Sequence, residues 1–339
     1  MVSEMIECVP NISEGRNTEF IERIAEILRG TSGVSLLDVQ QGYDTHRSVY
    51  TFVGSISAVE EAAFLLVKNA VAGIDMRIHR GSHPRIGAAD VVPFIPFAPV
   101  MRDACIALSR RLAERVWKDL AVPVYLYGYA ATSPRRVRLP DIRKGQYEEL
   151  ERKMALPEGH PDYGDRFNPK AGALVTGVRD FMLAYNVNLD TRDVEMARRI
   201  ARKVRSSGSP SGTGRERVPG LLSFCQADGW FLPEYGFCQV TMNLHNPAVT
   251  GLHHAFEAVR KEAAILGLEV KGSELIGLAP LSAVAAAGRY YLGKEETDEA
   301  TLVAEAVRSL GLNMPGFFDP EEKIIEYRLR RETQGLSAS

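Results

Sequence analysis

Cysteine and tryptophan are scarce in this sequence of 339 residues, which contains four cysteines and two tryptophans. The cysteines form no CxxC pair and lie among apolar neighbours, at Cys8, Cys105, Cys225 and Cys238. A disulfide framework or a zinc site would require paired or closely spaced cysteines. We therefore predict four buried free thiols in a reducing compartment.

Long apolar runs and an excess of positive charge are also missing. No run approaches the roughly 18 apolar residues that mark a membrane helix. The first ten residues carry Glu4 and Glu7 and lack the order of a signal peptide. The formal net charge of -2 argues against non-specific binding to nucleic acid, which usually needs a basic excess. We predict a cytoplasmic globular protein with neither a membrane nor a nucleic-acid partner.

Several common binding and catalytic signatures are absent as well. The sequence has no GxxxxGK[ST] and no GxGxxG that opens a helix after a strand, so nucleotide binding has no support. It has no GxSxG motif of serine hydrolases either. Its composition, with 45% hydrophobic and 25% charged residues, is that of a globular protein long enough for two domains.

The first half of the chain predicts the order β-α-β-β-α-β. Apolar residues at alternating or helical spacing mark these elements. The strands are expected at residues 5–9, 34–39, 48–53 and 89–95, and the helices at 20–28 and 58–72. A further helix at 101–120 and a strand at 122–126 follow.

The same order recurs in the second half, which indicates an internal repeat. Strands are expected at 181–189, 220–226, 238–244 and 275–279, and helices at 192–204 and 249–266, with a flexible loop at 206–219. The fold class is α/β (α+β), with two ferredoxin-like split β-α-β subdomains and a ligand channel between their sheets. The predicted domains are 1–180 and 181–330, with a frayed polar tail at 331–339.

The stretch from Ile78 to Gly87 is the strongest candidate for chemistry. It contains His79, His83, Arg80 and Arg85, together with helix-breaking Gly81, Pro84 and Gly87. The two histidines have the four-residue spacing of metal ligands on a helix, but a helix cannot run through this loop. We therefore predict no metal site. A loop before a buried strand is a common place for an active site, which favours His83.

Two other regions have candidate ligand-binding residues. One is a group of basic residues that could form a positive surface patch attracting a polyanion, or could be an ordinary solvated surface. Its members are Arg135, Arg136, Arg138, Arg143, Lys144, Lys170 and Arg179. The turn-rich residues 163–172 lie just before the second repeat. By contrast, the adjacent His253 and His254 fall in a predicted helix, so at most one can face the core.

Several motifs resemble those of the glutamate formiminotransferase family, and the resemblance covers nearly the whole chain. They lie at residues 7–15 (ECVPNISEG), 37–39 (LDV), 47–54 (RSVYTFVG), 83–87 (HPRIG), 92–96 (VPFIP), 122–128 (VPVYLYG), 318–320 (FDP) and 324–327 (IIEY). The resemblance implies transfer of the formimino group from N-formimino-L-glutamate to N5 of tetrahydrofolate. It also implies two α/β subdomains with a ligand channel between them, and a homodimer.

The resemblance also implies roles for particular residues. The family's catalytic histidine corresponds to His83. Its folate-contacting loop corresponds to Gly164, Asp165, Arg166, Phe167, Asn168, Pro169, Lys170, Ala171 and Gly172. We expect further substrate or folate contacts from Asp38, Gln40, Arg47, His79, Arg85 and Arg179. Tetrahydrofolate is expected as a co-substrate, with no tightly bound cofactor.

The chemistry suits an imidazole, because the ordinary pKa of histidine near 6.5 lets one group take a proton and give it back. Two alternatives stay open. One is a folate-dependent transferase with another formyl or formimino donor, and the other is a non-catalytic folate-binding paralogue. Gln40 and His46, where the family pattern more often has aspartate and asparagine, are the only hints of the non-catalytic paralogue, and retention of the His83 loop weighs against it.

Overall fold

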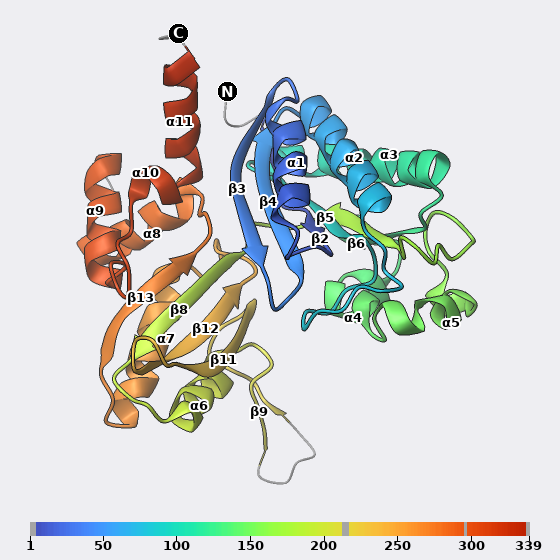
Figure 1. Cartoon of the computed structure of the whole chain (residues 1–339). Helices are drawn as coiled ribbons and strands as arrows, with labels where there is room; N and C mark the ends of the chain where they lie inside the picture. The colour runs from blue at the N-terminus through green and yellow to red at the C-terminus, as the bar shows by residue number, and fades with distance from the viewer. Residues whose placement is uncertain (1–4, 212–216, 295–296, 337–339) are drawn as a thin grey trace. The chain divides into compact units, whose positions relative to one another are not determined.

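The computed structural model describes residues 5–211, 217–294 and 297–336 of a mixed α/β chain (Figure 1). The chain divides into two compact units, Met1–Arg179 and Asp180–Ser339. Among the described residues, no helix is long and apolar enough to cross a membrane. All four cysteines are buried and free, as predicted.

The first unit begins with the predicted order of elements. These elements are β1 (Ile6–Cys8), β2 (Asn11–Ile12), α1 (Thr18–Arg29), β3 (Val34–Gly42), β4 (Arg47–Gly54), α2 (Ile56–Gly73) and β5 (Ala89–Pro96). The first predicted strand, 5–9, is β1, and the short strand β2 was not predicted; Pro10, which cannot donate a backbone hydrogen bond, lies between the two. The predicted helix and strand that follow are α3 (Arg102–Leu120) and β6 (Val124–Gly128).

Hydrogen bonding joins these strands into one mixed sheet. From one edge the order is β3, β4, the two short strands β1 and β2, and then β5, and all these pairs are antiparallel. Beyond β5 lie β7 (Leu174–Val178) and β6, both paired in parallel.

Strand β7 was missed by the sequence analysis, which placed Gly177 in a loop. The strand is short and fully buried, and it lies between β5 and β6. A Cβ atom at Gly177 would lie 2.1 Å from the Tyr127 carbonyl oxygen, so glycine here marks a close backbone approach.

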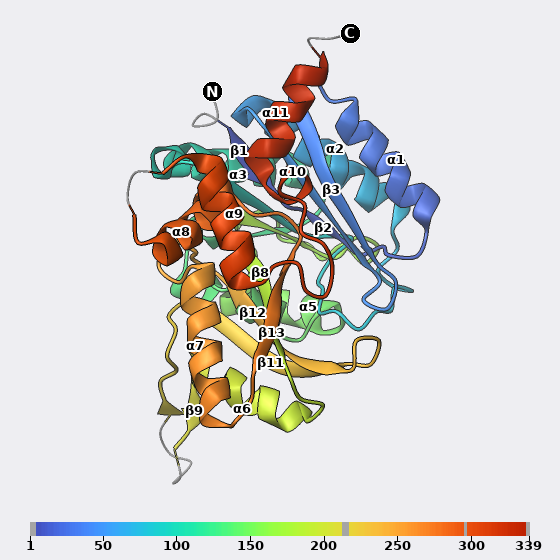
Figure 2. The same cartoon turned by 90° about the vertical axis from the view of Figure 1, so that its left-hand side faces the viewer.

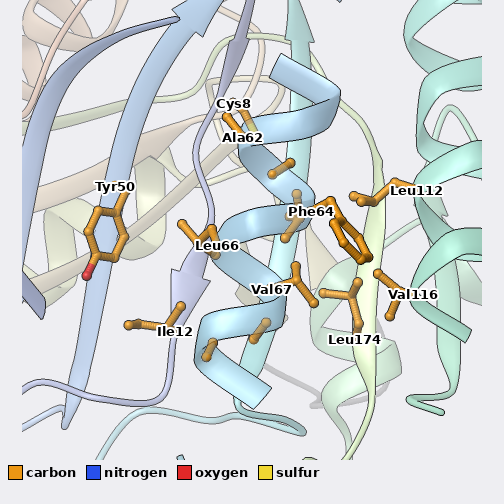
Figure 3. Close-up of a cluster of buried hydrophobic side chains, with 14 of the residues drawn as sticks. Cys8, Ile12, Tyr50, Ala62, Phe64, Leu66, Val67, Leu112, Val116 and Leu174 are labelled. Atoms are coloured by element: carbon orange, nitrogen blue, oxygen red, sulfur yellow. The ribbon is translucent and has the colours of Figure 1, made fainter. Parts of the chain in front are cut away.

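One face of this sheet carries the hydrophobic core. In register across β1, β4 and β5, Cys8 lies opposite Phe52 and Phe94 on the side covered by helices. Figure 3 shows Phe64 of α2 pointing towards Leu112 and Val116 of α3. On the other face, polar Glu7 and Thr51 alternate with these residues, and a second apolar cluster lies along β5, β7 and β6.

Helix α1 shows why the local sequence folds as predicted. The Asn17 side chain caps the helix by accepting a hydrogen bond from the backbone N–H of Phe20, at 3.0 Å. Phe20, Ile21, Ile24 and Leu28 recur at helical spacing and are buried.

The second unit repeats the order of elements. It contains β8 (Leu183–Leu189), α6 (Val194–Val204), β11 (Cys225–Leu232), β12 (Phe237–Leu244), α7 (Leu252–Ile265) and β13 (Val270–Ile276). The four strands form an antiparallel sheet in the order β11-β12-β8-β13. This order matches β3-β4-β1/β2-β5 of the first unit, which confirms the predicted repeat of elements.

Strand β11 begins five residues later than the predicted strand at 220–226. Asp228 and Gly229 resemble a turn in sequence, yet they pair with Thr241 and Val240 of β12. A Cβ atom at Gly229 would lie 2.5 Å from the Ala197 carbonyl carbon of α6. Glycine therefore serves close helix–strand packing here.

The predicted loop at 206–219 contains a short antiparallel pair, β9 (Ser209–Pro210) and β10 (Arg217–Val218), and its residues 212–216 lie outside the described part. Helices close the chain. They are α8 (Leu281–Leu292), α9 (Glu299–Leu310), α10 (Pro320–Lys323) and α11 (Ile325–Leu336). Figure 2 shows α9 beside α8. Residues 331–336 of the predicted frayed tail continue α11.

Candidate functional site

The face of the first sheet opposite its helices is polar near β3 and β4. The pairing register, together with the rule that residues two apart on a strand share a face, places six polar side chains on this surface. They are Glu7, Asn11, Asp38, Gln40, Arg47 and Thr51. Three of them were predicted to contact substrate, namely Asp38, Gln40 and Arg47. The sheet therefore brings together residues from four strands on one surface.

A β-bulge decides that Asp38 lies on this face. Leu36 pairs with Phe52 on the core side, whereas Asp38 pairs with Thr51 after a register shift. In a regular strand, residues two apart share a face, so without the bulge at Leu37 the Asp38 side chain would lie on the core face with Leu36. Gln40 Nε2 donates a hydrogen bond to Asp38 Oδ2 at 2.8 Å, so this amide orients the carboxylate.

The loop from Ile78 to Gly87 is not helical, as predicted. Gly81 and Gly87 do not adopt a positive φ, the conformation for which glycine is usually needed in a turn. They are needed here because neighbouring backbone packs closely against them. A Cβ atom at Gly81 would lie 2.3 Å from the Thr45 carbonyl oxygen. His46 sits in the same turn with φ of 49°, a left-handed conformation in which asparagine, aspartate and histidine are enriched.

His79 and Arg85 form the support of this loop. His79 Nε2 lies 2.9 Å from the His46 carbonyl oxygen, and Arg85 Nε donates to His79 Nδ1 at 3.2 Å. The two imidazoles of His46 and His79 stack at 4.3 Å. Arg85 also makes a bidentate ion pair with Glu148, at 2.7 and 2.8 Å. Both ring nitrogens of His79 thus have protein partners, and the structure gives His79 and Arg85 a positioning role.

Replacing Arg85 by alanine is expected to lower the free energy of unfolding by about 2–3 kcal/mol, because a buried guanidinium loses its charge-assisted hydrogen bonds. Urea denaturation measures this change. Arg152, whose side chain is 80% exposed, provides the matched control, and Arg152→Ala should change stability little. If both substitutions lower the free energy of unfolding equally, Arg85 does not stabilise this loop.

His83 contacts Arg47 of the polar face. Arg47 Nη1 lies 2.7 Å from His83 Nε2, and a guanidinium can only donate. The lone pair of the neutral imidazole therefore lies on Nε2 and its proton on Nδ1. His83 Nδ1 is buried and has no hydrogen-bond partner among the described residues.

Arg143 and Asp90 complete this group. Asp90 lies at the start of β5, is buried, accepts the backbone N–H of Ile86 at 2.8 Å and forms an ion pair with Arg143. The structure thus moves Arg143 out of the predicted basic surface and into the neighbourhood of His83. Sequence reasoning missed Asp90, whose only signal was a charged residue inside an apolar strand.

Burial, followed by the positive charges of Arg47 and Arg143, lowers the pKa of His83 from 6.5 to about 4. The imidazole is therefore neutral throughout the physiological pH range and begins as a proton acceptor. Burial, followed by the charge of Arg143, also lowers the pKa of Arg47.

An NMR titration of the His83 ring nitrogens should show protonation near pH 4 in the unliganded protein. In Arg47→Gln the pKa should rise towards 6.5 but not reach it, because burial remains the largest cause. Arg152→Gln should leave the titration unchanged. An unchanged His83 pKa in Arg47→Gln would contradict the charge effect.

The predicted folate loop at 164–172 is joined to the His83 loop through the backbone. The backbone N–H of Ala88 donates to the Ala171 carbonyl at 2.8 Å, and that of Ala173 to the Ile86 carbonyl at 3.0 Å. Gly87 and Gly172 form a bridge between them. A Cβ atom on either would lie 2.1 Å from a carbonyl oxygen of the other loop, so both glycines are required for contact.

The folate loop has its own anchors and borders a cavity. Asn168 Nδ2 donates to the Ala121 carbonyl at 3.2 Å, and Lys170 Nζ to the Ala72 carbonyl at 2.7 Å. The cavity, of about 530 Å³, is lined by Trp117, Lys118, Ala121, Arg166, Phe167, Asn168 and Pro169. The depression is shallow and open, and its lining combines aromatic and basic side chains.

The remaining basic residues do not form one surface group. Arg136 makes an ion pair with Asp162 at 2.7 Å, and Arg138 lies 3.9 Å from Asp141. Arg179 is the last residue of the first unit. Burial raises the pKa of Tyr127, and the positive charge of Arg179 offsets part of that rise. Some of the basic side chains considered as a positive surface patch or a solvated surface therefore have local partners.

The second unit has a polar network that sequence reasoning missed. Gln239 Nε2 donates to Asn188 Oδ1 at 2.7 Å and to Glu274 Oε2 at 3.2 Å, while Trp230 Nε1 donates to Gln239 at 3.0 Å. These residues lie on the sheet face opposite the core of this unit. His253 is buried and His254 exposed, as predicted for neighbours in a helix.

A neutral imidazole lies beside two guanidiniums on a loop that is joined to residues 164–172, an arrangement suited to proton transfer on an anionic substrate. The chain matches the family model "Formiminotransferase domain, N-terminal subdomain" over residues 5–179 and "Formiminotransferase domain" over residues 184–330. The chain belongs to the formiminotransferase family.

Named relatives agree with this membership. A formimidoyltransferase-cyclodeaminase of Dictyostelium discoideum is 43% identical over 99% of this chain and 63% of its own length. Glutamate formimidoyltransferases of Streptococcus pyogenes serotype M1 and Thermoplasma acidophilum are each 40% identical, over 88% of this chain and 96% of their own length. The chain spans less than two thirds of the cyclodeaminase-containing relatives.

Proposed function

We propose that this protein transfers the formimino group from N-formimino-L-glutamate to N5 of tetrahydrofolate, giving 5-formiminotetrahydrofolate and L-glutamate. The proposal is supported most by the backbone junction between the His83 loop and residues 164–172, which puts the predicted proton shuttle and the predicted folate loop in one substructure. Relatives named glutamate formimidoyltransferase, which this chain matches over nearly their whole length, support it further.

The proposed mechanism uses His83 as a proton shuttle. N5 of tetrahydrofolate attacks the formimino carbon, and the resulting tetrahedral species carries an extra proton on N5. Neutral His83 accepts this proton and donates it to the glutamate nitrogen, after which the bond between carbon and that nitrogen breaks. Glutamate then leaves as a neutral amine, and the imidazole returns to its starting state.

The other parts of the proposal concern binding and assembly. Tetrahydrofolate would contact residues 164–172 and the adjoining cavity as a co-substrate, with no tightly bound cofactor. Asp38, Gln40 and Arg47 would face the substrates from the polar sheet surface. We extend the proposal to ferredoxin-like subdomains with a ligand channel, a cytoplasmic location and a homodimer.

The first experiment is an anaerobic assay with tetrahydrofolate and N-formimino-L-glutamate. Glutamate release is followed together with the folate product by mass spectrometry. Equal amounts of glutamate and 5-formiminotetrahydrofolate are expected. Folate binding without glutamate release would overturn the proposed reaction, and competition with formiminoglycine or a formyl donor would then identify another donor.

A further inference from the structure

Three side chains beside one another present hydrogen-bond donors that the protein leaves unused. Within the described residues, His83 Nδ1 and Arg143 Nε are buried without a hydrogen-bond partner. Among the described residues, the Arg47 side chain donates to His83 Nε2, which uses one of its five N–H donors. A buried donor without a partner costs free energy. Such donors from three elements in one place indicate a site for an acceptor that arrives from outside.

The charges in this place are unbalanced. Arg47 and Arg143 contribute two positive charges, whereas Asp90, which pairs with Arg143, contributes one negative charge. His83 is neutral in this setting. Of the nearby carboxylates, Glu148 pairs with Arg85, and Glu14 accepts hydrogen bonds from the backbone N–H groups of Arg16 and Asn17. Arg47 and Arg143 together therefore carry one positive charge more than Asp90 neutralises, which favours an anion beside them.

We propose that Arg47 and Arg143 form a carboxylate subsite beside His83, and that a carboxylate bound there draws Arg47 away from Nε2 of the imidazole. This inference rests on the proposed function, in which the carboxylate belongs to the amino-acid donor. Planar guanidiniums bind carboxylates through paired, charge-assisted hydrogen bonds.

The release of Nε2 follows from hydrogen-bond chemistry. Arg47 can only donate, so its 2.7 Å contact covers the lone pair with which His83 must accept a proton. A carboxylate is a stronger acceptor for a guanidinium than a neutral imidazole is. Its arrival therefore exchanges the Arg47–His83 hydrogen bond for an Arg47–carboxylate bond. The imidazole becomes a usable base when the donor substrate is in place.

Substitutions of Arg143 test the subsite by steady-state kinetics. Arg143→Gln should raise the KM for N-formimino-L-glutamate roughly 10- to 100-fold, the effect of one lost charge-assisted hydrogen bond, and change the KM for tetrahydrofolate less than about threefold. If Arg143→Gln does not fold, Arg143→Lys tests the same effect on donor binding, because lysine keeps a positive charge beside the buried Asp90. It should give an intermediate KM. Arg152→Gln is the control and should match the unmodified protein.

A second readout does not depend on turnover. L-glutamate is titrated into the protein while the His83 ring nitrogens are followed by NMR. We expect the Nε2 signal to shift with saturation in the unmodified protein, and affinity for L-glutamate to fall at least fivefold in Arg143→Lys.

The outcomes separate the two proposals. Saturable glutamate binding that depends on Arg143, without formimino transfer, would support the subsite and overturn the proposed reaction. Normal transfer with an unchanged donor KM in both Arg143 variants would overturn the subsite alone. A larger increase in the KM for tetrahydrofolate than for the donor would also overturn it, since the arginine would then serve the folate.

Discussion

Replacement of His83 by alanine is expected to lower kcat by about 10²- to 10⁴-fold, the contribution of a positioned general acid and base. The expected loss lies in kcat, because the shuttle acts on the tetrahedral species and not on either bound substrate. The His83 side chain is held by one hydrogen bond, from Arg47, so its removal should leave the fold intact.

Three measurements make this expectation specific. The free energy of unfolding of His83→Ala should remain close to that of the unmodified protein, and the dissociation constant for tetrahydrofolate should change little. Free imidazole added to the variant should restore part of the activity, since it supplies the missing proton acceptor. A turnover within tenfold of the unmodified protein would rule out the shuttle.

The second large effect is expected at the junction between the two loops. Gly172 has a φ of 70°, and a Cβ atom there would lie 2.1 Å from the Ile86 carbonyl oxygen. Gly172→Ala therefore combines left-handed strain with a backbone clash, together about 2–5 kcal/mol of destabilisation. Because the loops must separate to relieve the clash, the KM for tetrahydrofolate should rise at least about tenfold.

Gly267 offers a matched control for this substitution. Its φ is 71°, and nothing lies within 4 Å of a Cβ atom built there. Gly267→Ala should thus cost only the conformational strain, about 1–2 kcal/mol, and leave the KM for tetrahydrofolate unchanged. Thermal denaturation and steady-state kinetics of both variants provide the comparison. If the two substitutions have the same effects, the junction has no special role in folate binding.

Sequence periodicity predicted most of the regular elements because their apolar residues recur with the period of a helix or a strand. Helix α1 and strand β4 illustrate this, since their buried positions are visible in sequence. Strand β7 escaped because Gly177 resembles a loop residue. Only packing against Tyr127 explains that glycine. The early end predicted for β11, at residue 226, has the same origin at Gly229.

The candidate site divides in a similar way. The loop character of residues 78–87 followed from proline and glycine, and the role of His83 followed from the family motif. The sequence favoured His83 over His79 by its motif, and the structure separates the two by their partners. His79 is held at both ring nitrogens by His46 and Arg85, whereas His83 has an unpaired Nδ1.

The sequence by itself therefore determined the order of elements, the internal repeat, the loop and the family. The tertiary structure alone decided which charges meet. Arg143 and Asp90 are 53 residues apart, as Arg47 and His83 are 36 apart, and no local pattern links either pair. Their meeting depends on sheet register, since β2 pairs both with β4, which carries Arg47, and with β5, which carries Asp90. Register is set by long-range pairing that a local sequence pattern does not contain.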